Sequence, residues 1–428
     1  MEKIYNPGKD EWQEVLKRPT QTVADMEAIV DRVFTAVENE GDMALRKFTK
    51  QFDGAVLESF EVSADEILES RSKISSELQE AIQTAKYNIE VFHKAQQTKK
   101  IEVETTNGVR CWQEKRPIQK VGLYIPGGTA PLFSTILMLG VPAKIAGCEE
   151  VVLCSPPDKN GKIHPAILYT AHLCGISKVF KLGGIQAIAA MTFGTDTIPQ
   201  AYKIFGPGNQ YVTVAKQIAT KHGIAIDMPA GPSELLVMAD DSANASFVAS
   251  DLLSQAEHGT DSQVILVSTS KGLIDTVEKE VALQLEELPR KEIARIAIGN
   301  SKLIYVDDDK TAVDLINVYG PEHYIVCVAN EDFYIDRVIN AGSVFIGNYT
   351  PESAGDYASG TNHTLPTNGY AKQYSGVNLD SFMKSITFQK ISKGGIRKIG
   401  RTIELMAAAE GLQAHKNAVT LRLKSLEQ

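Results

Sequence analysis

The sequence lacks long hydrophobic runs, an apolar leader and an excess of positive charge. No apolar stretch reaches the roughly 18 residues that a membrane-spanning helix needs, and the N-terminal MEKIYNPGKDEWQ has no apolar segment typical of a secretory signal. The formal net charge of −9 argues against a nucleic-acid partner, because such binding needs clustered Lys and Arg. We therefore expect a soluble, cytoplasmic protein with no nucleic acid and no membrane among its partners.

The sequence also has few cysteines and no CxxC pair. The cysteines are odd in number and far apart: Cys111, Cys148, Cys154, Cys174 and Cys327. This pattern indicates neither a disulfide framework nor a thiolate zinc site, so we interpret them as small buried hydrophobic side chains. A third absence is the GxGxxG fingerprint of conventional dinucleotide-binding domains, so local motifs alone do not establish NAD⁺ binding.

What the chain does contain favours an α/β protein of more than one domain. Apolar residues at helical spacing predict helices over 24–39, 42–48 and 64–92. From Val121 onward, four short apolar runs (VGLYI, EVVLCS, KVFKL and YKIF) each end in glycine or proline and precede a helical stretch. This repetition predicts βα units that form a parallel sheet, and in such sheets ligands bind beyond the carboxyl ends of the strands.

A second series of strands follows, with the sequences QVILVST, KLIYVDD, HYIVCVAN and SVFIGN. We therefore predict two Rossmann-like parallel-sheet domains with a helical N-terminal region and a small helical C-terminal arm. The expected division is an N-terminal segment (1–22), a first Rossmann-like domain (23–120 with 234–378), a second (121–233) and the arm (379–428). The arm is too short to bury its own apolar surface, so it must pack on another domain or subunit.

Three local patterns contain candidate metal-binding, catalytic or cofactor-binding residues, and each also has a purely structural explanation. Gln255 and His258 share one face of a helix end and offer an amide and an imidazole to a metal, although a histidine there also favours the helix dipole. Glu322 and His323 precede a strand and either supply a base and a water activator or cap a helix and meet solvent. Asn209 follows Gly-Pro-Gly and either contacts phosphate or ribose or is an N-cap.

Several segments, taken in order over nearly the whole chain, resemble histidinol dehydrogenases. They include YIPGGTAPLFSTILMLGVPAKIAGC, IFGPGNQYVTVAK, AGPSELLVMAD, SQAEHG, YGPEHY, SAGDYASGTNHTLPT and AAAEGLQAHKNAVTLR. Any one segment is a weak signal, but the ordered series is highly specific. The resemblance implies a Zn²⁺ ion, with Mn²⁺ as the alternative, held by four residues: Gln255, His258, Asp356 and His415. Nitrogen and oxygen ligands without thiolate suit an open site of this kind.

The resemblance also assigns the substrate and cofactor contacts. It implies that L-histidinol is bound by Ser233, Gln255, His258, His323, Asp356, His363, Glu410 and His415. It implies that NAD⁺ is bound by Tyr124, Gln186 and Asn209. In the implied reaction, His323 takes a proton in each of two oxidations, from L-histidinol to the aldehyde and from its hydrate to L-histidine, while Glu322 activates the water.

The resemblance finally implies a homodimer with shared active sites. The C-terminal arm of each chain would be swapped onto the partner subunit, so that His415 and Glu410 act in the partner's site. Two other functions remain as alternatives. A zinc-dependent hydrolase would use the same metal and Glu-His pair without reducing NAD⁺. A non-catalytic binding protein would be expected to lack a base or a ligand, and this chain has them all.

Overall fold

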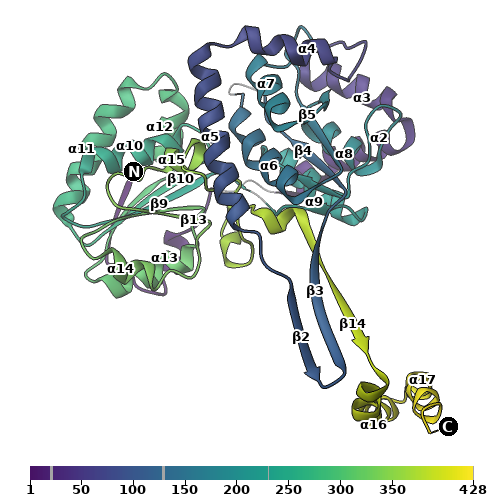
Figure 1. Cartoon of the computed structure of the whole chain (residues 1–428). Coiled ribbons are helices and arrows are strands. Elements are labelled where there is room, and N and C mark those ends of the chain that lie inside the picture. Colours follow the sequence, from purple (N-terminus) through teal and green to yellow (C-terminus); the bar gives the residue numbers. More distant parts are fainter. Residues whose placement is uncertain (20–22, 128–130, 230, 428) are drawn as a thin grey trace. The chain divides into compact units, whose positions relative to one another are not determined.

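The structure, a computed structural model, describes residues 1–19, 23–127, 131–229 and 231–427 (Figure 1). The chain divides into two compact units, Met1–Gln96 with Ile118–Phe382 and Gln97–Pro117 with Met383–Gln428. The first unit contains two parallel sheets and their helices, and the second contains an antiparallel sheet and two helices. The predicted α/β class with parallel sheets is therefore confirmed.

The five-stranded sheet of the first unit is parallel throughout, with the order β6-β5-β4-β7-β8. Its strands are β4 (Lys120–Tyr124), β5 (Glu150–Ser155), β6 (Lys178–Lys181), β7 (Lys203–Phe205) and β8 (Ala225–Ile226). The helices that follow the first four strands are α6 (Phe133–Ala146), α7 (Pro165–Cys174), α8 (Gly184–Phe193) and α9 (Gln210–Lys221). The first four strands are the runs predicted from the sequence. Their interiors are apolar because helices cover both faces of a parallel sheet.

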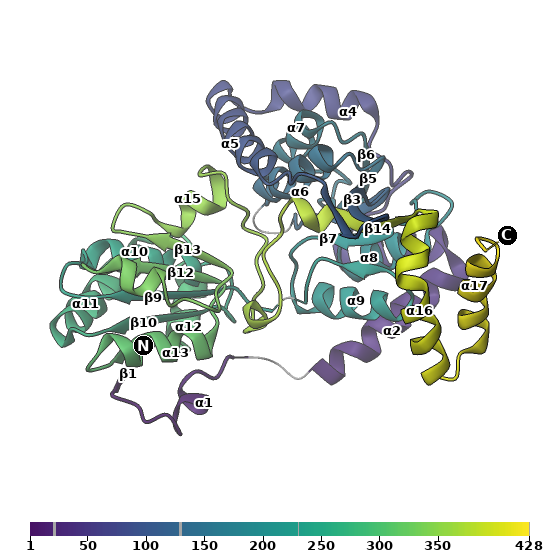
Figure 2. The same ribbon diagram turned by 60° about the horizontal axis from the view of Figure 1, so that its bottom comes forward.

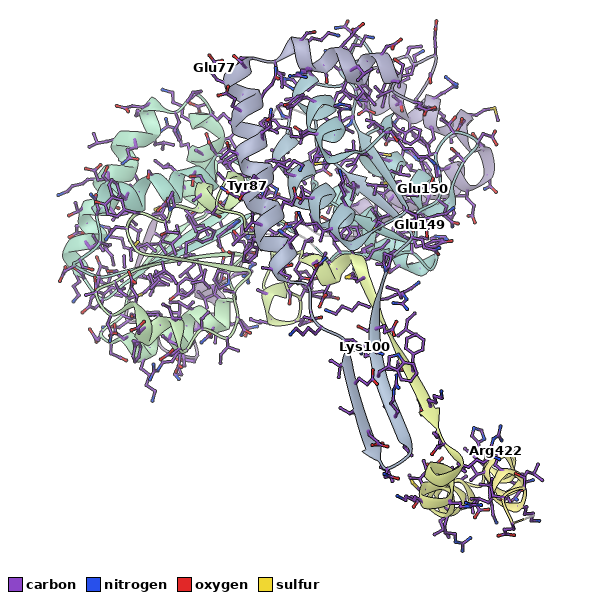
Figure 3. The ribbon with its side chains drawn as sticks, in the orientation of Figure 1. Glu77, Tyr87, Lys100, Glu149, Glu150 and Arg422 are labelled. Atoms are coloured by element: carbon purple, nitrogen blue, oxygen red, sulfur yellow. The ribbon has the colours of Figure 1, made fainter. Side chains whose placement is uncertain are left out.

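The N-terminal helices form an outer layer on this sheet. They are α2 (Val23–Glu40), α3 (Asp42–Phe48), the π turn η1 (Thr49–Asp53), α4 (Ala64–Glu69), the 3₁₀ turn η2 (Ser70–Lys73) and α5 (Ser76–Ala95). Helix α2 packs on α8 and α9, α4 on α7, and α5 on α6. Figure 3 labels Glu77 and Tyr87 along α5, whose other face buries Ile82 and Ile89.

The sequence had suggested grouping residues 23–120 with 234–378, whereas α2 and α3 share a core with the five-stranded sheet. Helical periodicity shows that one face of a helix is buried, but it does not show which sheet covers that face. The domain boundaries themselves stay a prediction.

One glycine in this sheet brings two loops together. Gly206 follows β7 with a φ of 132°, and a Cβ at this position would collide with the backbone carbonyl oxygen of Tyr124 at the end of β4. Only glycine permits this approach. The Gly206-Pro207-Gly208 turn is further held by Lys216, whose Nζ donates to the Gly206 carbonyl oxygen at 2.9 Å and pairs with the buried Asp227 carboxylate. The carboxyl ends of β4 and β7 therefore meet at one edge.

The six-stranded sheet of the first unit is also parallel, with the order β1-β11-β10-β9-β12-β13. Its strands are β1 (Glu2–Tyr5), β9 (Glu234–Ala239), β10 (Gln263–Ser268), β11 (Lys302–Tyr305), β12 (His323–Cys327) and β13 (Ser343–Ile346). The last four were predicted as strands, whereas β1 and the central β9 were not. Strand β1 comes from the N-terminal segment and pairs with β11 at the sheet edge.

Helices cover both faces of the six-stranded sheet (Figure 1). One face packs on α10 (Ala245–Ala256), α11 (Lys271–Glu287) and α12 (Lys291–Gly299). The other packs on α1 (Trp12–Val15), α13 (Asp309–Tyr319) and α14 (Glu331–Ile335). After β13 the chain forms α15 (Glu352–Tyr357), a long irregular stretch, and the short 3₁₀ turns η3 (Tyr370–Lys372) and η4 (Leu379–Phe382).

The second unit contains the antiparallel sheet β14-β3-β2, whose strands are labelled in Figure 1, and a pair of helices (Figure 2). Its elements are β2 (Ile101–Thr106), β3 (Val109–Pro117), β14 (Met383–Ile391), α16 (Lys393–Ala409) and α17 (Gln413–Lys424). The helices meet closely at Gly400, where a Cβ would lie 2.9 Å from the Leu423 side chain. The two predicted helices around Gly411 are present, but the sheet was not predicted. Within the described part of the chain, no helix is long and apolar enough to span a membrane.

Candidate active site

Glu322 and His323 lie at the start of β12, where both side chains are buried. The turn before them begins at Gly320, which ends α13 with a φ of 64°. Oε2 of Glu322 accepts the backbone N–H of Glu234 at 2.9 Å and lies 3.7 Å from Nδ1 of His323. Nδ1 is also 3.2 Å from the carbonyl oxygen of Glu234 at the start of β9. The pair therefore lies at the amino edge of the six-stranded sheet.

The electrostatic surroundings shift both groups. Burial raises the pKa of Glu322 to about 8, and the nearby His323 imidazole opposes this rise only in part. Burial alone would lower the pKa of His323, but the surrounding carboxylates of Glu352, Glu322 and Asp356 outweigh it, and the pKa is well above its ordinary value. Among the described residues, the buried Nε2 of His323 has no hydrogen-bond partner. A proton-transfer pair with one free nitrogen is the arrangement that acid-base chemistry needs.

A group of metal-type ligands lies beside this pair. The side-chain ligand atoms of His258, Glu352 and Asp356 all lie within 4.8 Å of one another. Gln255, in the last turn of α10, is buried and its amide nitrogen faces the Glu352 carboxylate when the amide is oriented to satisfy both groups. Nε2 of His323 is 3.7 Å from Oδ1 of Asp356. Imidazole, carboxylate and amide donors without thiolate fit an open site for a borderline divalent cation.

The structure therefore brings together three of the four predicted metal ligands and adds one residue that the sequence reasoning missed. Glu352 and Asp356 are four residues apart on α15, which places both carboxylates on one face of that helix. This spacing is visible in the sequence, but Glu352 was not singled out. Burial raises the pKa of Glu352, whereas the pKa of Asp356 is lowered, because its attraction to His323 outweighs its own burial.

Two predicted substrate contacts lie at the borders of this group. His363 is held by its Nδ1, 2.9 Å from the backbone carbonyl oxygen of Asp356, and by its Nε2, 3.1 Å from the hydroxyl of Thr135 on α6. Ser233 immediately precedes β9, and its carbonyl oxygen accepts the N–H of Gln263 at 3.2 Å. Both residues come from segments that flank the pair at the start of β12.

The remaining two predicted contacts, Glu410 and His415, belong to the second unit. Glu410 is the C-cap of α16, and His415 lies in the first turn of α17. Both side chains are exposed. Neither side chain is therefore part of the apolar core of the second unit.

The predicted NAD⁺ contacts lie at the carboxyl edge of the five-stranded sheet. Tyr124 ends β4, and its hydroxyl accepts the N–H of Gly184 at 3.1 Å at the start of α8. Gln186 lies in the first turn of the same helix and is fully buried. Asn209 is the N-cap of α9, because its Oδ1 accepts the N–H of Val212 at 3.1 Å. The helix-capping alternative for Asn209 is thus confirmed, and its amide nitrogen remains a donor at this edge.

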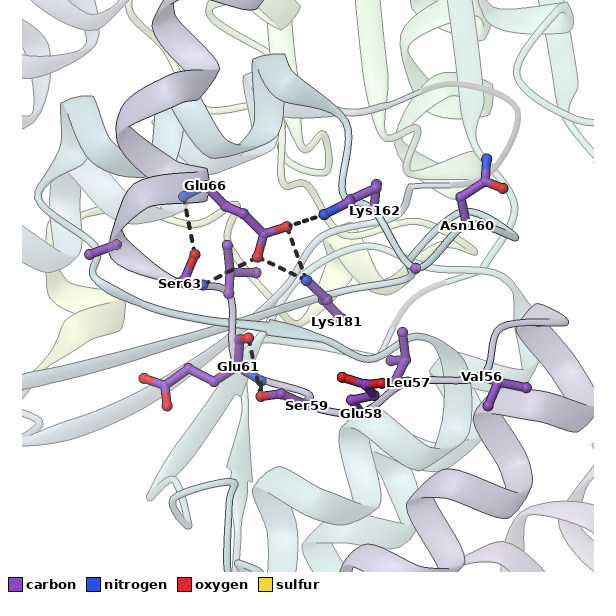
Figure 4. Close-up of a pocket in the computed structure, with 13 residues that line it drawn as sticks. Val56, Leu57, Glu58, Ser59, Glu61, Ser63, Glu66, Asn160, Lys162 and Lys181 are labelled. Atoms are coloured by element: carbon purple, nitrogen blue, oxygen red, sulfur yellow. Dashed lines mark hydrogen bonds and ion pairs between the residues drawn. The ribbon is translucent and has the colours of Figure 1, made fainter.

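A separate polar pocket of about 540 Å³ lies beside α4 and the end of β6 (Figure 4). Its main charged group is Glu66, whose carboxylate pairs with Lys162 and Lys181 at 3.0 Å each. Glu66 also completes a capping box with Ser63 at the start of α4. Because Glu66 both pairs with two lysines and caps α4, these charged side chains have a structural role that needs no ligand.

Comparison with known proteins identifies relatives over the full chain. A family model described as Histidinol dehydrogenase matches residues 16–423. A histidinol dehydrogenase of Bacteroides thetaiotaomicron is 58% identical over 427 residues, covering 100% of both chains. One from Escherichia coli is 51% identical, covering 98% of this chain and 96% of the relative. The crystal structure of histidinol dehydrogenase from Elizabethkingia anophelis matches with a TM-score of 0.98 and 57% identity, covering 100% of this chain and 99% of that chain.

Proposed function

Because the chain belongs to the histidinol dehydrogenase family of oxidoreductases, we propose that it oxidises L-histidinol through the aldehyde to L-histidine, with NAD⁺ as the oxidant. When bound, NAD⁺ would supply the hydride acceptor for each of the two oxidations. The observation that carries the proposal is the buried Glu322–His323 pair beside a cluster of metal-type ligands. Water adds to the aldehyde between the steps, so two NAD⁺ are reduced for each L-histidinol.

His323 and Glu322 have different tasks in this proposal. In its neutral form, His323 takes the hydroxyl proton of the alcohol, and later that of the aldehyde hydrate, through its unpartnered Nε2. A cation bound at the neighbouring carboxylates would favour that form, because it would offset the negative charge that raises the pKa of His323. Glu322 orients and deprotonates the water, and its place next to His323 lets one site serve both steps. Keeping the aldehyde in one site avoids its loss to solvent between the oxidations.

We further propose that Gln255, His258 and Asp356 hold a Zn²⁺ ion, with Mn²⁺ as the alternative, and that His415 of the partner subunit is the fourth ligand. When bound, the ion would supply a positive charge that orients the nitrogen atoms of the substrate. The contact of the Gln255 amide nitrogen with Glu352 supports this set, because it leaves the amide oxygen free as a ligand. Glu352 is then a positioning residue for Gln255. Ser233, His363 and the partner subunit's Glu410 contact the substrate.

A homodimer with shared sites is the assembly that this ligand set requires. The second unit supports it, because several large apolar side chains on its helices remain exposed, namely Leu405, Met406, Leu412 and Leu421. An apolar surface of this kind on a small unit is typical of a subunit interface. Swapping the arm would cover these side chains and bring Glu410 and His415 to the partner's site.

The test is the stoichiometry of the reaction. Purified protein is incubated with L-histidinol and excess NAD⁺, and NADH absorbance and L-histidine are measured together. We expect two NADH for each L-histidinol consumed. One NADH, with free aldehyde accumulating, would contradict the shared site for both steps, and no NADH would favour the zinc-dependent hydrolase. The control is the His323→Asn variant under the same conditions.

A further inference from the structure

A carboxylate from the outer helical layer reaches the edge of the five-stranded sheet where the NAD⁺ contacts are proposed. Asp53 ends the π turn η1, and its Oδ2 accepts a hydrogen bond from Nε2 of Gln186 at 3.0 Å. Gln186 is fully buried in the first turn of α8. Within the described part of the chain, its other amide atom, Oε1, is buried without any hydrogen-bond partner.

Asp53 fixes which way the Gln186 amide points. If the amide turned over, its oxygen would face the Asp53 carboxylate, and two acceptors would then be in contact without a proton between them. The nitrogen is therefore held toward Asp53, and the oxygen is held away from it. A buried acceptor left without a donor is costly, so this oxygen indicates a donor that none of the described residues supplies.

The surroundings of the pair leave little freedom for Asp53 to move. At Gly183, in the turn between β6 and α8, a Cβ would lie 3.0 Å from Oδ1 of Asp53 and 2.6 Å from the Pro156 side chain. The turn is therefore packed against the carboxylate, and only glycine fits there. The next residue, Gly184, donates its N–H to the Tyr124 hydroxyl. Asp53 thus lies next to two of the proposed NAD⁺ contacts, Tyr124 and Gln186.

Burial disfavours the charged form of Asp53. Burial raises the pKa of Asp53 to about 6, and the hydrogen bond from Gln186 lowers it only in part. A partly buried carboxylate that serves only packing would be replaceable by a neutral side chain with a gain in stability. Groups that are kept ionised against burial cluster at functional sites.

We propose that Asp53 is a positioning residue of the cofactor site, holding the Gln186 amide so that its Oε1 accepts a hydrogen bond from a hydroxyl or amino group of NAD⁺. This inference rests on the proposed function, because it requires NAD⁺ to bind at this edge. It assigns a role in cofactor binding to a residue of the N-terminal helical layer. In this chain, which has no GxGxxG loop, a side-chain amide fixed by a carboxylate contributes part of the recognition.

The experiment measures NAD⁺ binding directly by calorimetry with the full chain and without L-histidinol. Asp53→Asn removes the charge and lets the Gln186 amide adopt either orientation. We expect the Kd for NAD⁺ to rise about tenfold, the effect of losing a hydrogen bond to a charged group. The KM for NAD⁺ should rise with it, whereas kcat and the KM for L-histidinol should change little. Asp196→Asn, which makes the same charge change at an exposed position, is the matched control and should leave the Kd unchanged.

A second set of variants, made in the Gln186→Glu chain, separates a positioning role of Asp53 from a general structural effect. Gln186→Glu places two carboxylates together, and adding Asp53→Asn restores a donor between them while an acceptor still faces NAD⁺. Asp53→Asn should therefore weaken NAD⁺ binding in the unmodified chain but strengthen it in the Gln186→Glu chain. An equal loss in both backgrounds would show that Asp53 acts independently of Gln186 and would overturn the proposal.

The outcomes also distinguish this inference from the proposed function. If the unmodified chain binds NAD⁺ and the folded Asp53→Asn chain binds it equally well, the inference fails and the proposed function stands. If the folded unmodified chain binds no NAD⁺ and reduces none with L-histidinol, both fail. Circular dichroism melting verifies folding, and Asp53→Ser, a smaller neutral replacement, provides the same comparison if Asp53→Asn does not fold.

Discussion

The carboxylate of Glu352 faces the imidazole of His323, with Oε1 3.8 Å from Nδ1, although the two residues come from different elements. Both side chains are buried. Together with Glu322 and Asp356, Glu352 surrounds the imidazole with negative charge. Such a concentration of buried carboxylates is stable only when protons or a cation balance it, which agrees with the metal site proposed for the neighbouring residues.

Substitutions in the catalytic pair should separate the two oxidations. His323→Asn removes the proposed base for both steps, so we expect the rate from L-histidinol to fall by about two to four orders of magnitude. Glu322→Gln removes the water activator, so oxidation of the aldehyde should slow more than oxidation of L-histidinol. Stopped-flow NADH measurements with each substrate check this difference. An equal loss in both half-reactions would contradict the role of Glu322.

Metal removal should abolish activity and leave the fold largely intact. The proposed ligands of the first unit, Gln255, His258 and Asp356, lie outside the two apolar cores that cover the six-stranded sheet. We expect dialysis against a chelator to eliminate NADH formation, and Zn²⁺ to restore it, while the far-ultraviolet circular dichroism spectrum stays unchanged. Cooperative unfolding on chelation would instead mean that the metal is structural.

Complementation should reveal a site shared between two subunits. His415→Ala and His258→Ala chains are each expected to be inactive. If they are unfolded and refolded together, each mixed dimer should contain one intact site, formed by the body of the His415→Ala chain and the arm of the His258→Ala chain. Random pairing predicts up to roughly a quarter of the unmodified activity.

The control for this experiment is each variant refolded alone, which should regain no activity. If His415 instead served its own chain, both sites of every mixed dimer would be damaged. The mixture would then remain as inactive as the separate variants.

The ion network of Glu66 should make stability depend on pH. Burial tends to raise the pKa of Glu66, but hydrogen bonds from Lys181 and Lys162 outweigh it and lower the pKa to about 2. Because the folded pKa is below the ordinary value of 4.5, the stabilisation is fully present above pH 4.5 and is lost as the pH falls toward 2. Glu66→Gln should therefore cost about 1–3 kcal/mol at pH 7, after allowance for partial exposure.

Urea unfolding at pH 7 and at pH 4 measures this effect, and the difference between the two proteins should shrink at the lower pH. Glu69→Gln is the matched control, because its pair with Lys73 on the neighbouring turn is exposed. We expect it to cost less than about 0.5 kcal/mol at either pH. A pH-independent difference for Glu66→Gln would mean that its contribution is packing rather than charge.

Local patterns in the sequence predicted much of this fold and site. The four runs after Val121 repeat strand, turn and helix within short distances, so their parallel sheet was predictable. Gln255 and His258 share a helix turn and Glu322 and His323 are adjacent, so each pair was recognisable without tertiary information. Their convergence with Asp356 was implied only by resemblance, because it depends on how α10, β12 and α15 pack.

Other features depend on contacts between distant segments and were not predictable in this way. Strand β9 lies inside its sheet between β10 and β12, but its sequence ELLVMA is apolar after Glu234 and shows no alternating strand periodicity. The expectation that ligands bind at carboxyl edges suits Tyr124, Gln186 and Asn209. It does not suit His323, which begins its strand at the amino edge. Glu352 lies in a polar stretch with several hydroxyl side chains and one other carboxylate, Asp356, and no local pattern distinguishes it there.

The second unit has a consequence for synthesis of the chain on the ribosome. Every residue of β3 pairs with a residue of β14, and all of Ile118–Phe382 lies between these two strands in the sequence. The first unit has therefore emerged almost completely before the hairpin of β2 and β3 can acquire its third strand. Until then β3 exposes an unpaired edge, which is a hazard for aggregation. A nascent chain that stalls before Met383 would thus hold nearly all the residues of the first unit and still be prone to associate through this edge.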